Sequence, residues 1–394
     1  MKFNQWTLGL AAVGAVSLAS AVRADEAKLS ALQTALSSVT ISGYVDVGAN
    51  WTAGDQPTYD QYSSVKKTDR FSLNDIVISL DKPLDESKWA SGFHVDLNWG
   101  EDAIAVSGLN GFKSYNKNGF DYGPVRQAYV ALRTPVGNGI DWKVGLMDGI
   151  TGYEGNTSYL NPNISRSFGY GVNPASFAGI LGTYKIVDAV SVTLGLINAT
   201  GASSYGTTYY TPSVSSKGYV AAVSLTAPDS WGFLKGSTLS AQTIQNFEGH
   251  STGTSQYNSV NNYSVSATLN TPLAGLKFGM AYDYVQVLGN GKSPDGAVYG
   301  VYAMYQATDK LSFAARGEYL DARYWVPNIG GVVGTDWDTG KGSEVTFTVA
   351  YNLWANVISR VEFRWDHSDN YGEYSKNENN SDLIGVTLSL VYKF

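Results

Sequence analysis

Apolar and polar side chains alternate with a period of two residues along most of this chain, and no other feature restricts its fold so strongly. In the last segment, apolar or aromatic residues occupy every second position from Ile384 to Phe394. Segment 357–366 carries Val361, Phe363 and Trp365 on one face and charged residues on the other. Successive side chains of a β-strand point to opposite sides of its sheet, so this pattern predicts strands with one apolar and one polar face.

Sixteen segments show this alternation or a closely related pattern. The predicted strands cover residues 39–51, 71–81, 89–99, 125–133, 140–147, 177–186, 190–198, 218–227, 237–247, 260–271, 276–287, 297–307, 311–320, 344–353, 357–366 and 383–394. Segment 71–81 changes phase near Asn74, which predicts a β-bulge at that point.

The connections between these segments alternate between short and long over the whole chain, and the longest, 148–176, is the third of the long ones. A soluble sandwich has no reason to sort its loops in this way. An outer-membrane barrel does, because its short turns face the periplasm and its long loops face the outside. An even number of strands then places both ends of the barrel on the periplasmic side.

Charged residues indicate which strand face meets lipid. Placing Arg360 or Arg364 at the middle of a bilayer would cost roughly 2–4 kcal/mol for each residue, so the charged face must look into the lumen. Closure is required because an open edge would leave unpaired amides in lipid. The sequence therefore predicts an all-β fold: a transmembrane antiparallel β-barrel of about sixteen strands, wide enough for a water-filled lumen.

Composition excludes several other classes of protein. The chain has no cysteine and three histidines, so disulfides and Cys-ligated metal sites are excluded, and no metal or cofactor is predicted. Its formal net charge of −7 argues against nucleic acid as a partner. The many Tyr and Trp residues near predicted strand ends fit the aromatic girdles that flank the apolar band of such barrels.

Two segments precede the first predicted strand. Residues 1–24 combine Lys2, an uncharged and mostly apolar run, and small residues before Asp25, which indicates a signal peptide. Its removal would lower the formal net charge from −7 to −9 by taking away Lys2 and Arg23. Residues 25–38 place three leucines on one stripe and predict a short periplasmic helix, with a partner-binding arm as the alternative.

Segment 125–133 reads VRQAYVALR, the turn 135–139 reads PVGNG, and NPNISRS follows at 161–167. With the first strand and the ending Tyr392-Lys393-Phe394, this region resembles the bacterial family of β-barrel porins often called porin-like outer-membrane β-barrel proteins. The resemblance implies an outer-membrane channel for passive diffusion of ions and small hydrophilic solutes, surrounded by outer-membrane lipid. Tyr392 and Phe394 resemble the terminal signal that barrel-assembly machinery recognises, and sixteen-stranded general porins suggest a homotrimer by analogy.

In general porins of sixteen strands, the third outer loop folds into the lumen. That resemblance implies that the barrel, residues 39–394, contains an inward-folded loop at 148–176. The loop would place Asp148, Glu154 and Arg166 at the narrowest point, together with Tyr153 and Tyr170. The facing wall would carry the other charged candidates, which are Lys143, Arg316, Glu318, Arg360, Glu362 and Arg364.

Two interpretations of these charges stay open. Charges of both signs across a narrow gap would create a transverse field that sets ion preference, so neutralising Arg360 and Arg364 together should shift selectivity toward cations. The alternative is that the charges form salt bridges that stiffen the wall.

Two alternative functions are compatible with a barrel of this kind. A structural or adhesive barrel would use its long loops as a binding surface. An outer-membrane hydrolase would need a base, for which His94 and Asp96 share one strand face. No Gly-x-Ser-x-Gly element accompanies that pair, so the sequence predicts a channel and no enzyme.

Overall fold

The computed structural model describes residues 38–53, 69–103, 124–198, 200–202, 208–210, 217–247, 257–289, 295–323, 340–369 and 382–394. The predicted signal peptide and nearly all of the predicted periplasmic helix lie outside these ranges. Among the described residues, no helix is both long enough and apolar enough to cross a membrane.

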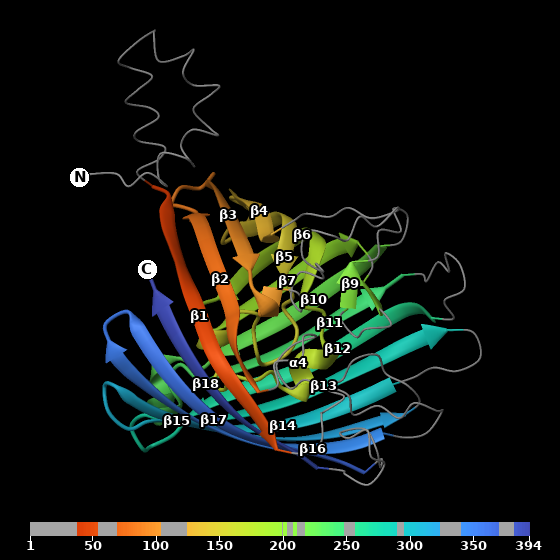
Figure 1. Ribbon diagram of the computed structural model, residues 1–394. Helices are drawn as coiled ribbons and strands as arrows, with labels where there is room; N and C mark the ends of the chain where they lie inside the picture. Colours follow the sequence, from red (N-terminus) through yellow and green to blue (C-terminus); the bar gives the residue numbers. More distant parts are fainter. Residues whose placement is uncertain are drawn as a thin grey trace, which may run out of the picture.

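Sixteen strands form one closed antiparallel barrel (Figure 1). They are β1 (Thr40–Ala53), β2 (Arg70–Lys82), β3 (Ser91–Trp99), β4 (Val125–Thr134), β5 (Ile140–Asp148), β6 (Ser176–Val187), β7 (Val190–Asn198), β10 (Lys217–Thr226), β11 (Thr238–Asn246), β12 (Tyr257–Asn270), β13 (Leu276–Gly289), β14 (Asp295–Gln306), β15 (Leu311–Arg323), β16 (Gly340–Trp354), β17 (Val357–Ser368) and β18 (Asp382–Lys393). Each of the sixteen predicted segments coincides with one of these strands, which confirms the predicted fold. A two-stranded hairpin of β8 (Thr200–Ala202) and β9 (Thr208–Tyr210) lies between β7 and β10 in the chain.

Closure of the barrel is made by β1 and β18. The pairing extends to the last residue, because Gly43 and Phe394 exchange two backbone hydrogen bonds of 3.0 Å. Between β1 and β2 the register shifts: Asp46 pairs with Asp75 and Val47 pairs with Leu73. Asn74 is the extra residue, so the predicted bulge is confirmed, and its side-chain amide donates to the Asp46 carboxylate at 3.0 Å.

Successive connections lie at alternate ends of the barrel, and the seven at one end, of two to eleven residues, are short on average. The short ones cover residues 83–90, 135–139, 188–189, 227–237, 271–275, 307–310 and 355–356, and the fourth contains the 3₁₀ helix η2 (Asp229–Leu234). Because every pair of neighbouring strands is antiparallel, all short connections lie at the same barrel end as the start of β1 and the end of β18. We call this end the short-turn end.

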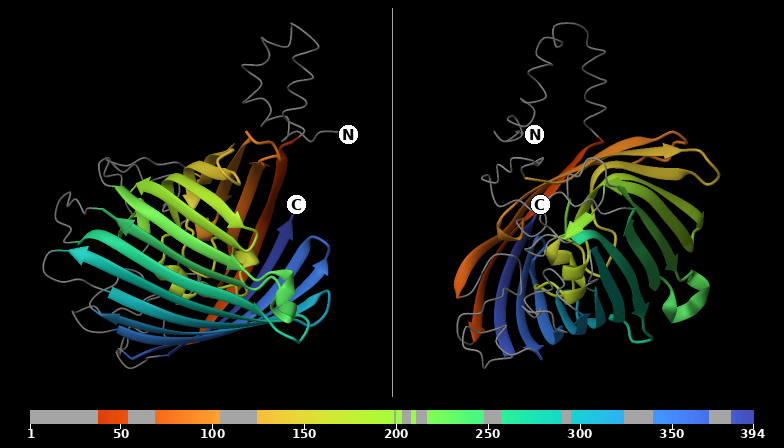
Figure 2. Two further views of the ribbon diagram at one scale, coloured as in Figure 1. Left: turned by 180° about the vertical axis from the view of Figure 1, so that it is seen from behind. Right: turned by 90° about the vertical axis from the view of Figure 1, so that its right-hand side faces the viewer.

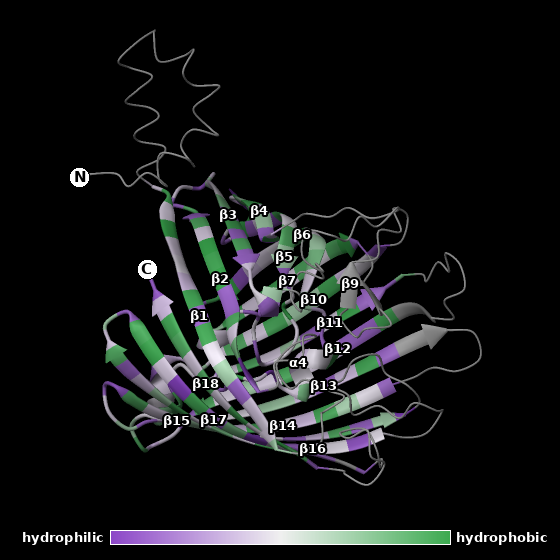
Figure 3. Ribbon diagram, in the orientation of Figure 1, coloured by the Kyte–Doolittle hydropathy of each residue, from purple (hydrophilic) through white to green (hydrophobic). Residues whose placement is uncertain are grey.

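The two faces of each strand differ sharply in exposure. On β17, Val361 and Phe363 are 49% and 45% exposed, whereas Glu362 between them is fully buried. Figure 3 shows bands of apolar residues alternating with polar ones along the strands. An apolar outer belt of this extent is far larger than a soluble monomer tolerates, so it indicates a surface that contacts lipid. The buried inner face places the charged side chains in the barrel interior.

Candidate functional site

Residues 149–175, which we call the inner loop, connect β5 to β6 and lie inside the barrel (Figures 1 and 2). The loop contains the 3₁₀ helix η1 (Ser158–Leu160) and the short helix α4 (Phe168–Val172). Its hydrogen-bond partners include residues of β15, which stands eight strands away from β5 in barrel order. In a ring of sixteen strands that position is diametrically opposite, so the loop crosses the lumen.

Two wall carboxylates hold the loop backbone. Glu362 on β17 accepts from the amides of Ile164 at 2.5 Å and Ser165 at 2.9 Å. Glu318 on β15 accepts from the first two amides of α4, those of Phe168 at 2.5 Å and Gly169 at 3.2 Å. Hydrogen bonds of this kind are charge-assisted and stronger than neutral ones. They satisfy amide groups that an irregular loop would otherwise leave unpaired in a buried place.

Arg316 on β15 is the centre of a buried ion network. Its guanidinium contacts Glu154 of the loop at 2.6 Å and Glu344 of β16 at 2.6 Å, and it donates to the carbonyl of Ser165 at 2.9 Å. The side chains of all three charged residues are fully buried. A buried charge is tolerated only when it is paired and its remaining donors are satisfied, and this arrangement meets that condition.

Two further arginines bind the loop through its carbonyl groups. Arg360 on β17 donates to the Ser158 carbonyl at 3.1 Å and contacts Asp46 of β1 at 3.3 Å. Arg364 donates to the Arg166 carbonyl at 2.5 Å and contacts Asp366 at 2.8 Å. Both guanidinium groups are buried beneath the loop, so neither presents a bare charge to the lumen.

Aromatic packing fixes the loop on β13 and β14. Tyr153 stacks on Tyr302 with ring centroids 4.2 Å apart, and its hydroxyl accepts from Thr268 of β12 at 3.0 Å. This packing requires a glycine at position 279, since a Cβ there would lie 2.3 Å from the Tyr153 hydroxyl. On the other side of the barrel, Ile150 packs on a buried apolar cluster of the inner wall. That cluster comprises Met147, Phe177, Leu181, Ile197, Val220 and Ile244.

The structure brings six of the predicted site residues together at the inner loop: Glu154, Arg316, Glu318, Arg360, Glu362 and Arg364. Arg166 contributes its carbonyl to Arg316 and Arg364, while its side chain lies 4.7 Å from the ring centroid of Tyr170. Burial raises the pKa of Tyr170 to about 12, so it stays neutral and donates to Asn156 at 2.7 Å.

Two predicted residues lie away from this network. Asp148, at the end of β5, pairs with Arg126 of β4 at 3.2 Å. Lys143 lies further along β5, with its ammonium group 4.8 Å from the ring centroid of Tyr129. Sequence reasoning missed four residues that bind or orient the loop, although each is a charged residue on a predicted strand. They are Asp46, Arg126, Asp283 and Glu344.

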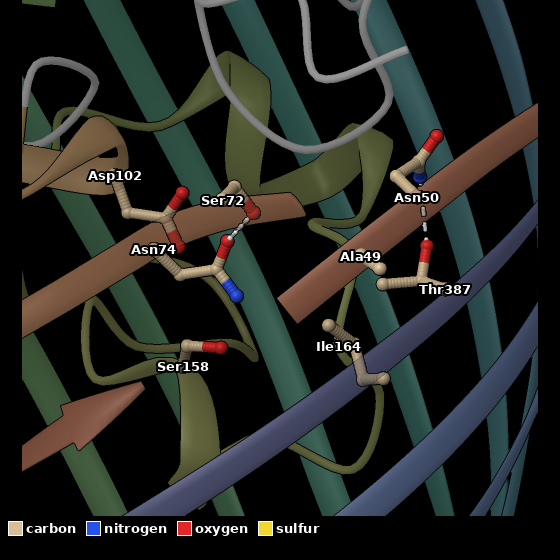
Figure 4. A pocket seen from close by; sticks show the side chains of 8 residues that line it. All are labelled: Ala49, Asn50, Ser72, Asn74, Asp102, Ser158, Ile164 and Thr387. Atoms are coloured by element: carbon tan, nitrogen blue, oxygen red, sulfur yellow. Dashed lines mark hydrogen bonds between the residues drawn. The ribbon is translucent and has the colours of Figure 1, made fainter. Parts of the chain in front are cut away.

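A small polar recess lies where the loop meets β1, β2 and β18 (Figure 4). Its lining includes Ser158 and Ile164 of the loop. Asn50 donates to Thr387 at 2.8 Å, and Ser72 donates to Asn74 at 2.6 Å. The lining side chains thus satisfy one another, which makes the recess part of the loop's packing against the wall.

His94 on β3 does not form the relay that a hydrolase would need. Its two ring nitrogens contact Asp81 at 2.9 Å and Asp96 at 3.0 Å. The nearby hydroxyl of Ser79 donates to Asp96 at 2.5 Å instead of facing the imidazole. Over the described ranges, no group of three or more His, Cys, Asp or Glu side chains is arranged to hold a metal ion.

Several solved structures of outer-membrane channels have a fold similar to that of this barrel. The channel DcaP of Acinetobacter baumannii matches with a TM-score of 0.57 and 12% identity, over 90% of this chain and 97% of that one. The anion-selective porin from Comamonas acidovorans matches with a TM-score of 0.55 and 12% identity, over 91% and 99%. The trimer form of OmpT of Vibrio cholerae matches with a TM-score of 0.53 and 12% identity, over 90% and 99%.

No curated protein sequence matches the chain. A family model does match, over residues 38–394, which is nearly all of the chain, and its description is "Putative beta-barrel porin-2, OmpL-like". The family and the fold together indicate a passive diffusion channel of the outer membrane rather than an enzyme. By this match the chain belongs to the OmpL-like β-barrel porin-2 family.

Proposed function

We propose that the inner loop is the constriction of a channel that passes ions and small hydrophilic solutes by diffusion. The observation that carries this proposal is the attachment of one connection to the opposite wall through Arg316, Glu318 and Glu362. A loop held across the lumen leaves only the space beside it for solutes. An unobstructed barrel of sixteen strands would instead hold a wide aqueous channel.

The charged network has a mechanical role in this proposal. Its arginines and glutamates keep the loop across the lumen. Removal of any one of these side chains would leave a buried charged or polar partner unpaired, which is energetically costly. Solutes therefore meet the outer surface of the loop and the uncovered part of the wall. Glu154 and Arg166, which belong to the loop, act on passage by fixing its shape. This role favours the salt-bridge interpretation over a transverse field made by the same charges.

The test replaces residues 155–170 by a short Gly-Ser linker and measures single-channel conductance in planar bilayers. We expect larger conductance steps than in the unaltered protein. The matched control shortens the connection between β15 and β16 by the same number of residues, and we expect its steps to be unchanged. Equal steps in both variants would contradict the constriction. A folded barrel that shows no steps at all would favour a structural or adhesive protein.

We propose three partners for this channel: outer-membrane lipid, barrel-assembly machinery and further copies of the same chain. Outer-membrane lipid covers the apolar belt, and barrel-assembly machinery recognises the carboxyl-terminal strand through Tyr392 and Phe394. These two side chains are 51% and 53% exposed, so their rings are accessible for recognition. Assembly as a homotrimer is proposed from the likeness to the trimeric OmpT form, and the mass of the detergent-solubilised complex tests it.

A further inference from the structure

Four lysines with no ion pair in the described part of the chain lie near the short-turn end of the barrel: Lys143, Lys185, Lys277 and Lys393. We call them the vestibule lysines. Lys185 is two residues from the end of β6, Lys277 is the second residue of β13, and Lys393 is the last residue of β18. Lys143 is the fourth residue of β5. All four therefore lie at a similar level of the wall.

Contacts with the inner loop show that two of these side chains are on the lumen face. The ammonium group of Lys393 is 5.7 Å from the ring centroid of Tyr159 in the loop. Lys277 is two residues before Gly279, whose inner side faces Tyr153 of the loop. Since residues two apart share a strand face, Lys277 also points inward. The Lys393 ammonium group thus lies beside the loop, and Lys277 lies two residues along its strand from the contact of Gly279 with Tyr153.

The other two lysines share strand faces with the buried inner cluster. Lys185 is four residues after Leu181 on β6, and Lys143 is four residues before Met147 on β5. Because the side-chain period of a strand is two, both lysines point into the lumen. Both side chains are exposed there, so their charges are available to a passing solute.

The vestibule lysines surround the lumen instead of gathering on one side. In barrel order, β18 and β13 are five strands apart, β13 and β6 are five strands apart, and β5 and β18 are five strands apart. Lys143 and Lys185 occupy neighbouring strands, so the four residues mark three nearly equally spaced directions. No wide sector of the wall at this level is therefore without a lysine.

Two acidic side chains of the inner face near this level contact basic side chains, and Asp188 and Asp309 lie on the short turns themselves. On the described inner face near the short-turn end, Asp141 pairs with Arg133 at 2.6 Å. Asp81 contacts His94 at 2.9 Å. The level of the vestibule lysines is thus locally positive, although the chain as a whole has a formal net charge of −7. Exposed charges beyond about 8 Å are largely screened at physiological ionic strength, so the local charge dominates.

We propose that the vestibule lysines give the channel a preference for small anions over small cations. Rings of Lys or Arg favour anions in other pores, because they replace part of the attraction that an anion loses with its water. Lys393 lies next to the inner loop, and Lys277 shares a strand face with Gly279, which the loop contacts. The inference rests on the proposed channel function, since a selectivity exists only if ions pass.

The test measures the reversal potential of single channels in a KCl gradient across a planar bilayer. We expect the unaltered protein to favour chloride. In the triple variant K143Q/K185Q/K277Q we expect the chloride-to-potassium permeability ratio to fall by about twofold for each lysine. One screened charge at about 8 Å in water changes the Boltzmann factors of chloride and potassium in opposite directions by about 1.4-fold each. The variant K143R/K185R/K277R should keep the original ratio, because it retains the charges.

Lys235 provides the matched control, because it pairs with Asp229 at 2.8 Å on the exposed turn of η2. The variant K235Q should leave the permeability ratio unchanged. Preference for potassium in the unaltered protein, or the same ratio in the glutamine and arginine triple variants, would overturn the anion preference while leaving the channel intact. Absence of conductance steps in the folded protein would overturn the channel function itself.

Discussion

Arg316 bonds at once to a wall carboxylate, a loop carboxylate and a loop carbonyl, so the position of the inner loop depends on it strongly. We expect Arg316→Leu to lower the free energy of unfolding by about 3–5 kcal/mol, because Glu154 would stay buried without a cation and Glu344 would lose its nearest one. Urea unfolding of the barrel in detergent micelles measures this loss. Single-channel recordings of the same variant should show a wider or less steady pore.

A matched control for that substitution is Arg133→Gln. Arg133 pairs with Asp141 at 2.6 Å, but both side chains are partly exposed at the short-turn end. Pairs of this kind contribute roughly 0–1 kcal/mol, so the unfolding midpoint should hardly move. If Arg133→Gln and Arg316→Leu destabilised the barrel equally, the buried network would not be what holds the loop.

Gly279 permits the second anchor of the loop, and its replacement is a purely steric test. Gly279→Val would place carbon atoms where the Tyr153 hydroxyl now lies, so Tyr153 must leave its stacking position on Tyr302. We expect the inner loop to shift and single-channel conductance to change. Gly317→Val is the control, because a Cβ at position 317 has no neighbouring atom closer than 3.8 Å. Its conductance should equal that of the unaltered protein.

At the scale of the element, period two was sufficient to predict the strands. The inward face of β17 and the bulge at Asn74 both follow from local alternation, because burial on one side of a sheet fixes the phase of each strand. The strands β8 and β9 of the hairpin have three residues each, which is too short to show an alternation of apolar and polar side chains. Its existence could not be derived from alternation.

Contacts of the inner loop could not be predicted for a different physical reason. The bond between Arg316 and Glu154 joins residues 162 positions apart, and the bond between Ile164 and Glu362 joins residues 198 positions apart. The alternation predicts that the side chains of Arg360 and Arg364 point into the lumen, but it does not predict which residues they contact. For that reason the sequence led us to expect an effect of these arginines on ion selectivity, whereas their burial leads us to expect an effect on loop position.

The last strand permits a test that separates assembly from folding. Phe394→Ala keeps the two backbone bonds with Gly43 but removes the exposed aromatic ring. If that ring is read by barrel-assembly machinery, the amount of protein in the outer membrane of expressing cells should fall severalfold. Refolding of the purified chain into detergent should proceed as before. A normal yield in cells would contradict the role of Phe394 as an assembly signal.

At the scale of the whole molecule, export and charge are linked. The mature protein should begin at Asp25, because the small residues before it suit cleavage by a signal peptidase. Mass spectrometry of protein extracted from outer membranes should therefore show loss of residues 1–24 and of the two positive charges they carry. A protein that retains Lys2 and Arg23 would contradict this prediction. Without residues 1–24 the chain is more acidic than the full-length chain. A preference for anions must therefore come from the positions of the charges in the lumen and not from the net charge.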